Sequence, residues 1–232
     1  MPDPLRPTRR SSTYAVRAPL VRWLEQEADR AATELDRRYR VLDVGSGTKP
    51  YLPIFGEYAE SYVAVDAVNP AADVQGTVEQ IPVPDGSFDV VVCTQVLEHA
   101  NDPAQAVREL RRVTAPGGRV LASTHGVQVY HPAPVDLWRW THAGLERLFA
   151  ENADWSALRV RPGSGTAACI GMLLTYYIDL AAARARLRRP AGLVVAAVNG
   201  VAERLDASSV RLREPGPGSL HANYHVTAEV PA

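Results

Sequence analysis

The segment Val41–Gly47 is predicted to be a strand that runs straight into a glycine turn, and Asp66 follows at the tip of the next apolar run. Gly45 can adopt backbone angles that are closed to other residues, and Gly47 lets a ligand approach the main chain closely. Backbone N–H groups at such a turn face a ligand at the carboxyl end of a strand. An acid at the spacing of Asp66 can accept hydrogen bonds from both hydroxyl groups of a ribose. The pattern predicts a site for a nucleoside.

Two features of this turn distinguish between classes of nucleoside ligand. The third glycine of a dinucleotide-binding turn is missing, because Thr48, Lys49 and Pro50 follow Gly47. Asp43, close before the glycines, would repel a pyrophosphate and attract the ammonium group of an amino acid. The turn therefore favours a ligand with a ribose and a cation, and it disfavours a nicotinamide-dependent dehydrogenase.

Candidate groups for proton transfer lie in the loop that follows the apolar run Arg119–Thr124. His125 is nearest to the end of that run and is the first candidate for a general base, with His131 second. A structural or substrate-positioning role for each histidine is the competing interpretation. Arg139 could hold an acidic group of a substrate, or it could form a salt bridge with Asp136. The candidates for substrate contact are Tyr14, His99, Tyr130, Trp138 and Arg139.

Composition argues against several other classes of protein. The formal net charge is −1, and no appended basic module is present, so a nucleic-acid partner is not expected. The histidines lack the spacing of metal ligands on a helix, and the two cysteines are unlike a zinc pair, so no metal is expected. Cys93 and Cys169 stand in apolar stretches, which is typical of free thiols in a reducing compartment. A cytoplasmic location is therefore predicted.

The candidate groups must be positioned by strands and helices, which the sequence predicts from short apolar runs that alternate with helical patterns. The most apolar run, Phe88–Cys93, is typical of a parallel strand that is covered on both faces. Asp102 is suited to cap a helix that begins at Pro103, and Thr141 is suited to cap another that ends at Phe149. Alternating strands and helices predict an α/β fold with a doubly wound, mostly parallel sheet. The predicted strands are 40–44, 62–65, 88–93, 119–124, 158–161 and 221–229.

The chain is predicted to form one domain over residues 1–232. Its parts are an N-terminal arm with cap helices (1–38), a cofactor-binding core (39–164), a helical insertion (165–212) and a closing strand (213–232). The stretch 165–183 is apolar apart from Asp179, and this charge favours a buried or interface helix over a membrane span. Its apolar surplus needs a partner surface, for which a homodimer is one expectation.

Four stretches of the chain resemble hallmark motifs of the class I S-adenosyl-L-methionine (SAM)-dependent methyltransferases, in particular the type 11-like family. These stretches are VLDVGSG, YVAVD, IPVPDGSFDVVVCTQVLEH and RRVTAPGGRVLAST, and the likeness covers residues 38–150. The resemblance implies a Rossmann-like seven-stranded sheet, mostly parallel, with an antiparallel last strand. It also implies SAM as the cofactor and S-adenosyl-L-homocysteine as the product.

The resemblance further implies a role for each part of the cofactor cradle, by which we mean the glycine turn 41–47, Asp66 and the residues around them. The glycine turn would hold the methionine end of SAM, Asp66 the ribose, and residues 77–80 would lie near the adenine. Residues 94–99 would line the reactive side of the cofactor. Many relatives carry an aspartate where Thr77 stands, and Thr77 can still accept a hydrogen bond. The implied cofactor-binding residues are Asp43, Gly45, Ser46, Gly47, Asp66, Ala67, Thr77, Val78, Glu79, Thr94 and Gln95.

The loop HGVQVYHPAPVDLWRWT, residues 125–141, is similar to that of a bacterial subgroup associated with surface-glycan or secondary-metabolite pathways. The predicted function is methyl transfer to an oxygen or nitrogen atom of a small metabolite, such as a natural product or a sugar-like acceptor, by in-line displacement. Two alternatives stay open. One is a SAM-binding enzyme that does not transfer methyl, such as a cyclase, and the other is a binding module without catalysis.

Overall fold

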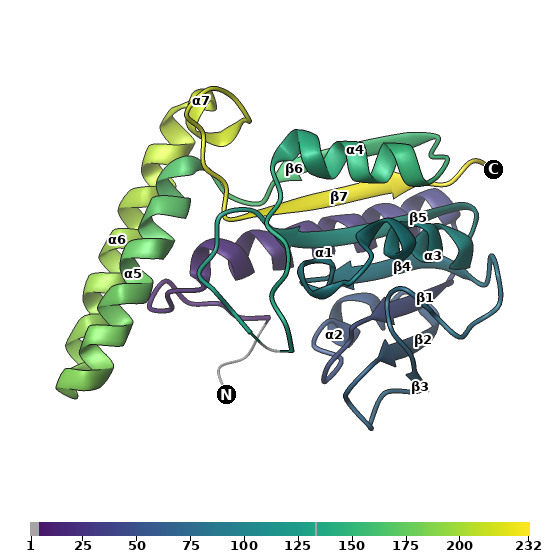
Figure 1. Ribbon diagram of the computed structural model, residues 1–232, viewed down its shortest axis with the longest axis horizontal. Coiled ribbons are helices and arrows are strands. Elements are labelled where there is room, and N and C mark those ends of the chain that lie inside the picture. The colour runs from purple at the N-terminus through teal and green to yellow at the C-terminus, as the bar shows by residue number, and fades with distance from the viewer. Residues whose placement is uncertain (1–4, 133) are drawn as a thin grey trace.

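Seven strands form one sheet in the order β3-β2-β1-β4-β5-β7-β6 (Figure 1). The computed structural model describes residues 5–132 and 134–232. Residues 1–4 of the predicted arm lie outside it, as does Ala133 of the loop 125–141, which we call the histidine loop. Strand β7 runs antiparallel to both β5 and β6, and the other neighbouring pairs are parallel. The predicted doubly wound, Rossmann-like sheet is therefore confirmed. The strands are β1 Tyr39–Val44, β2 Ala59–Asp66, β3 Val74–Gln75, β4 Phe88–Thr94, β5 Thr114–His125, β6 Ala157–Pro162 and β7 Asn223–Glu229.

Helices cover both faces of this sheet, which explains the apolar run in its centre. All seven residues of β4 are buried, as expected for a parallel strand between two helical layers. On one face, Leu20, Leu24 and Ala28 of the first helix pack against β1, β4 and β5. On the other face, the third and fourth helices pack against the sheet through apolar residues such as Leu110 and Phe149. The helices are α1 Tyr14–Leu35, α2 Leu52–Phe55, α3 Pro103–Val113, α4 His142–Asn152, α5 Thr166–Ala185, α6 Arg188–Ser208 and α7 Val210–Arg213, with a 3-10 turn at Leu97–His99.

Two side chains cap the helices that flank the histidine loop. The Asp102 carboxylate accepts a hydrogen bond from the backbone N–H of Gln105 at 3.0 Å, and α3 begins with Pro103. The Thr141 hydroxyl accepts one from the backbone N–H of Gly144 at 3.1 Å and begins α4. Each cap satisfies a helix N–H group that has no partner within the helix. These caps hold both ends of the segment that carries the candidate bases.

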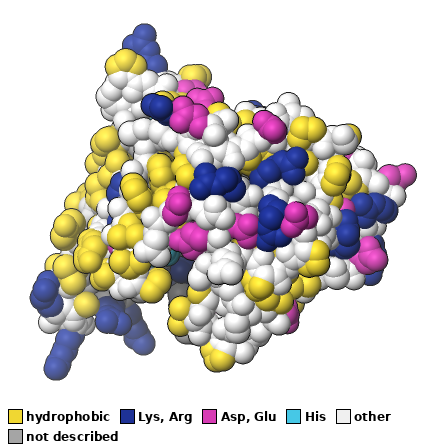
Figure 2. All heavy atoms as spheres, turned by 45° about the vertical axis from the view of Figure 1, so that its right-hand side comes forward, with side chains coloured by type: hydrophobic (Ala, Val, Ile, Leu, Met, Phe, Trp, Pro, Cys, Tyr) yellow, Lys and Arg dark blue, Asp and Glu magenta, His cyan; other side chains and the backbone are white. Residues whose placement is uncertain are grey.

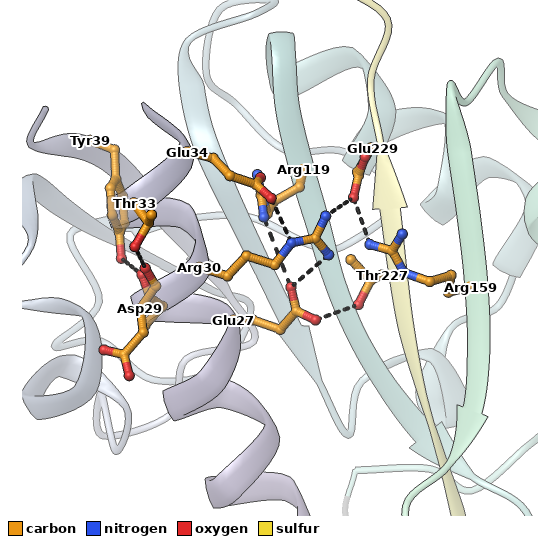
Figure 3. Close-up of polar contacts among 11 residues, drawn as sticks. Glu27, Asp29, Arg30, Thr33, Glu34, Tyr39, Arg119, Arg159, Thr227 and Glu229 are labelled. Carbon is orange, nitrogen blue, oxygen red and sulfur yellow. Dashed lines mark hydrogen bonds and ion pairs between the residues drawn. The ribbon is translucent and has the colours of Figure 1, made fainter. Parts of the chain in front are cut away.

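A network of charged side chains fastens α1 to β5, β6 and β7 (Figure 3). Arg30 of α1 and Arg159 of β6 both donate to Glu229 of β7, at 2.8 and 2.6 Å. The Arg119 side chain of β5 is only 4% exposed, and it pairs with Glu34 and lies 3.9 Å from Glu27. Because Arg119 is removed from water, its charge must be balanced by these carboxylates.

We expect Arg119→Ala to lower the free energy of unfolding by about 2–3 kcal/mol, because it removes the buried cation beside Glu27 and Glu34, which then share Arg30 alone within this network. Urea denaturation checks the effect. The matched control is Arg147→Ala, which breaks an exposed pair with Glu151 and is expected to cost less than about 0.5 kcal/mol. Equal losses in the two variants would show that the buried network contributes nothing to stability.

Helices α5 and α6 form a long hairpin that projects beyond the strand ends, on the side where β6 ends and β7 begins (Figure 1). A Cβ atom at Gly171 of α5 would contact the side chains of Ala202 and Val198 of α6, so the two helices pack closely and antiparallel. Helix α5 is long and apolar enough to cross a membrane by length and composition alone, which is weak evidence for a span. Its N-terminal half packs against α1 through Ala168, Cys169 and Met172.

Candidate active site and cofactor cradle

The turn after β1 adopts the conformation that its glycines allow. Gly45 has φ +73° and Gly47 has φ +51°, both in the left-handed region that favours glycine. A Cβ atom at Gly45 would lie 2.2 Å from a methyl group of Val96, so the Val96 side chain packs directly against the main chain of Gly45. A Cβ atom at Gly47 would have no heavy atom within 4 Å. The space over Gly47 is thus open to an approaching ligand. The backbone N–H groups of residues 45–47 are bonded within the protein, to the carbonyl of Val65 and the carboxylate of Asp66, so they do not face a ligand as was expected.

Asp66 stands at the end of β2 and faces this turn. Its carboxylate accepts backbone N–H groups of Gly47, Val68 and Asn69, each at 2.8 Å. Desolvation raises the pKa of Asp66, but these three hydrogen bonds outweigh it and hold the pKa below its ordinary value. A carboxylate offers about four acceptor sites, so one is left for a ribose hydroxyl. Ala67, the next residue, is exposed beside it.

Asp43 lies beneath the turn and is 1% exposed. The Tyr62 hydroxyl donates to its carboxylate at 2.5 Å. Burial raises the pKa of Asp43 to about 6, and the hydrogen bond from Tyr62 limits the rise. A cation bound nearby would stabilise the ionised carboxylate, since opposite charges attract strongly at a site removed from water.

The carboxyl ends of β3 and β4 complete the rim. Val78 is buried and Thr77 is exposed, in a tight turn where Thr77 forms a bridge with Gln80. Glu79 accepts the backbone N–H of Asn101 at 2.6 Å and so joins this turn to the loop before α3. At the end of β4, Thr94 is buried and Gln95 has φ +57°. The predicted cofactor residues thus lie at the carboxyl ends of β1, β2, β3 and β4, which the sheet places side by side.

The residues present fit a nucleoside that carries an amino acid. The Ser46 hydroxyl is buried in the turn and has no hydrogen-bond partner among the described residues, so it is free to bind a ligand. Gly47 is open, Asp66 retains an acceptor site, and Asp43 supplies a negative charge below. Among residues 5–132 and 134–232, no group of His, Cys, Asp and Glu side chains is arranged to hold a metal ion.

Beyond the cradle, His125 at the end of β5 faces a buried carboxylate. Its Nδ1 atom lies 3.4 Å from Oε1 of Glu98, and neither atom has another partner in the described part of the chain. The second oxygen of Glu98 accepts the Thr124 hydroxyl at 2.8 Å. Burial raises the pKa of Glu98 to about 7 and lowers the pKa of His125 to about 4. The imidazole is therefore neutral at physiological pH.

Two further histidines surround His125. The ring of His131 lies 6.4 Å from that of His125 and 5.8 Å from that of His99, measured between centroids. The backbone N–H of His131 donates to Asp136 at 2.8 Å, and Asp136 forms an ion pair with Arg139. The salt-bridge alternative for Arg139 is therefore realised, and it fixes the shape of the histidine loop.

The remaining substrate candidates lie at different distances from this cluster. Trp138 stacks on Trp140 at 5.6 Å between ring centroids, and its indole N–H donates to the carbonyl of Ala100 at 2.7 Å. Tyr130 is 74% exposed in the histidine loop. Tyr14 is apart from the others, because it lines a separate cavity of about 600 Å³ with α5, α6 and α7.

The cradle and the histidine cluster are joined through neighbouring strand ends. Gln95 donates its backbone N–H to the carbonyl of Ser123 at 2.7 Å, and its side-chain amide donates to the Ser123 hydroxyl at 2.7 Å. Ser123 is two residues before His125 on β5. The candidate bases therefore stand next to the segment that was predicted to line the reactive side of the cofactor.

The partners of the two buried carboxyl groups were not expected from the sequence. Tyr62 was assigned only to a strand, although a phenol on a buried strand beside Asp43 is a signal for such a bond. Glu98 was not among the individual residues expected to contribute to the site. Its backbone carbonyl does accept from Leu137 and Trp138, but its side chain also faces His125.

Comparison with known proteins places this geometry in a family. A family model described as a methyltransferase domain matches residues 16–154, more than half of the chain. The methyltransferase YcgJ of Bacillus subtilis, described as uncharacterised, is 33% identical over 108 residues, which are 40% of this chain and 43% of that protein. A probable SAM-dependent methyltransferase of Mycolicibacterium smegmatis is 45% identical over 78 residues, 33% of this chain and 30% of that protein. The matches thus span less than half the length of these relatives.

Solved structures share the fold at low sequence identity. The crystal structure of YcgJ from Bacillus subtilis aligns with a TM-score of 0.51 and 19% identity, over 90% of this chain and 98% of that one. The [4+2]-cyclase SpnF aligns with a TM-score of 0.53 and 18% identity, over 90% of this chain and 81% of that one. The sheet order, the glycine turn and the family match lead to one conclusion: the chain belongs to the class I SAM-dependent methyltransferases, whose cofactor is SAM.

Proposed function

We propose that the chain transfers the methyl group of SAM to an oxygen or nitrogen atom of a small metabolite, with His125 as the general base. The observation that carries this proposal is the buried pair of Glu98 and His125, with Oε1 and Nδ1 3.4 Å apart, at the end of β5. When bound, SAM supplies a methyl group that the positive sulfur already activates. What the protein must add is alignment and, for a hydroxyl acceptor, removal of a proton.

The ionised form of Glu98 prepares His125 for this task. A carboxylate beside Nδ1 places the proton of the imidazole on that nitrogen and leaves the lone pair on Nε2. Nε2 can then accept the proton of an acceptor hydroxyl or ammonium group. The imidazole is uncharged at neutral pH because burial lowers the pKa of His125 to about 4. The ionised Glu98 stabilises the imidazolium that forms when the ring accepts a proton, which offsets the weak basicity that burial causes.

The acceptor is proposed to bind over the histidine loop. Trp138 and Tyr130 offer partly exposed aromatic faces, and His131 and His99 offer ring nitrogens for hydrogen bonds. Such a surface suits a hydroxylated ring, either a sugar-like compound or a natural product. The free, buried thiols of Cys93 and Cys169 support a reducing, cytoplasmic setting for the reaction.

Formation of S-adenosyl-L-homocysteine tests the proposal. The purified chain is incubated with SAM and a panel of sugars, phenols and amines, and the product is quantified by mass spectrometry. We expect product above the rate without acceptor for at least one class. Conversion of an acceptor to an isomer without this product would instead support the cyclase alternative. A melting temperature that SAM does not raise would support the non-catalytic module.

We expect the rate of a hydroxyl acceptor to rise with pH through an acid limb near pH 7 and then to level off. Below the pKa of Glu98, about 7, the protonated carboxyl donates to Nδ1 and the imidazole proton moves to Nε2, so the base is lost. Glu98→Gln is expected to remove this limb and to lower kcat at pH 8 by about 10²-fold or more. Glu151→Gln, an exposed carboxylate on α4, serves as the control. Identical pH profiles in the two variants would contradict a positioning role for Glu98.

A further inference from the structure

The hairpin of α5 and α6 presents one apolar face that the rest of the protein does not cover. This hairpin face consists of five side chains that are each at least half exposed: Ile170 53%, Leu174 51%, Val194 51%, Val201 53% and Leu205 50%. Figure 2 shows hydrophobic side chains gathered over the hairpin. Helix α5 is largely exposed, because only 39% of its most apolar 18-residue stretch is buried inside the protein.

Helix geometry places these five residues on the same side of the hairpin. Each directly precedes a buried residue, as Leu174 precedes Thr175 and Val201 precedes Ala202. Gly171, which follows Ile170, packs against Ala202, so the buried residues mark the sides on which α5 and α6 face each other. In an α-helix, the residue before a given one points about 100° away from it around the helix axis. Because α5 and α6 are antiparallel, this rotation places the exposed residues of both helices on the same side of the hairpin. The hairpin face is therefore continuous across both helices.

The turn between the two helices is strongly basic. Arg184, Arg186, Arg188 and Arg189 form this arginine tip, and all four are exposed. Within residues 5–132 and 134–232, none of the four forms an ion pair. The whole chain has a formal net charge of −1, so the positive charge is local to the tip. Figure 2 shows Lys and Arg side chains at the free end of the hairpin.

We propose that the α5–α6 hairpin docks on the surface of a membrane that contains anionic lipids. The hairpin face would lie in the boundary between headgroups and acyl chains, and the arginine tip would bind headgroup phosphates. Apolar burial and attraction to anionic lipid act together in such interfacial helices. Tyr176 and Tyr177, 38% and 62% exposed, suit the interface because tyrosine has an apolar ring and a polar end.

Charge complementarity favours lipid over a second copy of the chain. In a pairing of hairpin with hairpin, a second copy would bring another arginine tip and few free acids to meet the first. Glu203 already pairs with Arg9 at 2.7 Å, and Asp206 accepts the backbone N–H groups of Ala167 and Ala168. Asp179 is the remaining acid in the two helices. An anionic bilayer supplies negative charge to the arginine tip and an apolar layer to the hairpin face.

Vesicle flotation of the full chain tests this proposal. The probes are vesicles of phosphatidylcholine alone and vesicles in which phosphatidylglycerol replaces part of it, both at low and at high salt. We expect binding to the anionic vesicles that weakens as salt increases, because charge attraction is screened. Removing tip charges with R186Q/R188Q/R189Q is expected to weaken binding by about fivefold per arginine, on the order of 100-fold in total.

Two further variants separate the proposal from its alternatives. R38Q/R108Q/R147Q removes the same charge from exposed positions outside the hairpin and is expected to bind as the wild type does. L174S/V201S removes apolar contacts and is expected to weaken binding without lowering the melting temperature, since both side chains are half exposed. Equal loss in both arginine variants, or equal binding to neutral vesicles, would overturn the proposal. So would a dimer in analytical ultracentrifugation that L174S/V201S dissociates while no vesicle binds, because the face would then belong to a second copy.

Discussion

Replacing His125 by alanine is expected to lower kcat for a hydroxyl acceptor by about 10²- to 10⁴-fold, the usual contribution of a positioned general base. The reason is geometric, because His125 is the histidine whose Nδ1 faces a buried carboxylate at 3.4 Å. The affinity for SAM should change little, since His125 lies beyond the cradle. Single-turnover formation of S-adenosyl-L-homocysteine gives the rate, and calorimetry gives the affinity.

The matched control for this variant is His142→Ala. The ring of His142 has a partner of its own, the backbone carbonyl of Val160 at 3.0 Å, and it contacts the ring of Tyr224 at the start of α4. We expect its kcat to stay near that of the wild type. A His125→Ala enzyme with unchanged kcat would mean that another group removes the proton, or that the acceptor needs no base.

Replacing Gly45 by alanine is expected to weaken SAM binding by at least about tenfold. The backbone angle of +73° costs a residue with a Cβ atom about 1–2 kcal/mol, so the turn of the variant relaxes to another angle in the free protein. Restoring the cradle on binding then costs this energy, and every 1.4 kcal/mol is a factor of ten in affinity. The new methyl group would also lie 2.2 Å from a methyl of Val96, which must move. Calorimetric titration with SAM measures the loss, and the melting temperature without SAM reports strain in the free protein.

Two other glycines separate the contributions at this turn. The methyl group of Gly47→Ala would contact no neighbouring atom, but the backbone at this position also has a positive φ. This variant therefore reports backbone strain and hindered ligand approach without a collision with Val96. Gly200→Ala, on α6 with open space around it, is expected to leave SAM binding unchanged and to stabilise the protein by up to about 1 kcal/mol. Wild-type affinity in the Gly45 variant would contradict a role of this turn in the cradle.

Most of the sheet could be predicted from the sequence because its signals are local. The run Phe88–Cys93 is apolar at every position but Asp89, and the observed strand extends it by only one residue. The caps at Asp102 and Thr141 depend on side chains within three residues of the N–H groups that they bind. By contrast, β3 has two residues and α2 has four, too short to give a period, and neither was predicted.

The sequence by itself determined the class of fold and the identity of the cofactor. Two short signals identify the cradle: a glycine with positive φ after a buried strand, and an acid after the next strand. Each signal involves only a few consecutive residues, so it can be recognised in the sequence. Only the tertiary structure brought Glu98 to His125, Tyr62 to Asp43, and Arg119 to Glu27 and Glu34. These partners are far apart in the chain, and the spacing of residues along a sequence carries no information on which strand ends become neighbours. The exposed apolar side of α5 and α6 is of the same kind, because an apolar stripe predicts burial and only packing shows which part of it is left uncovered.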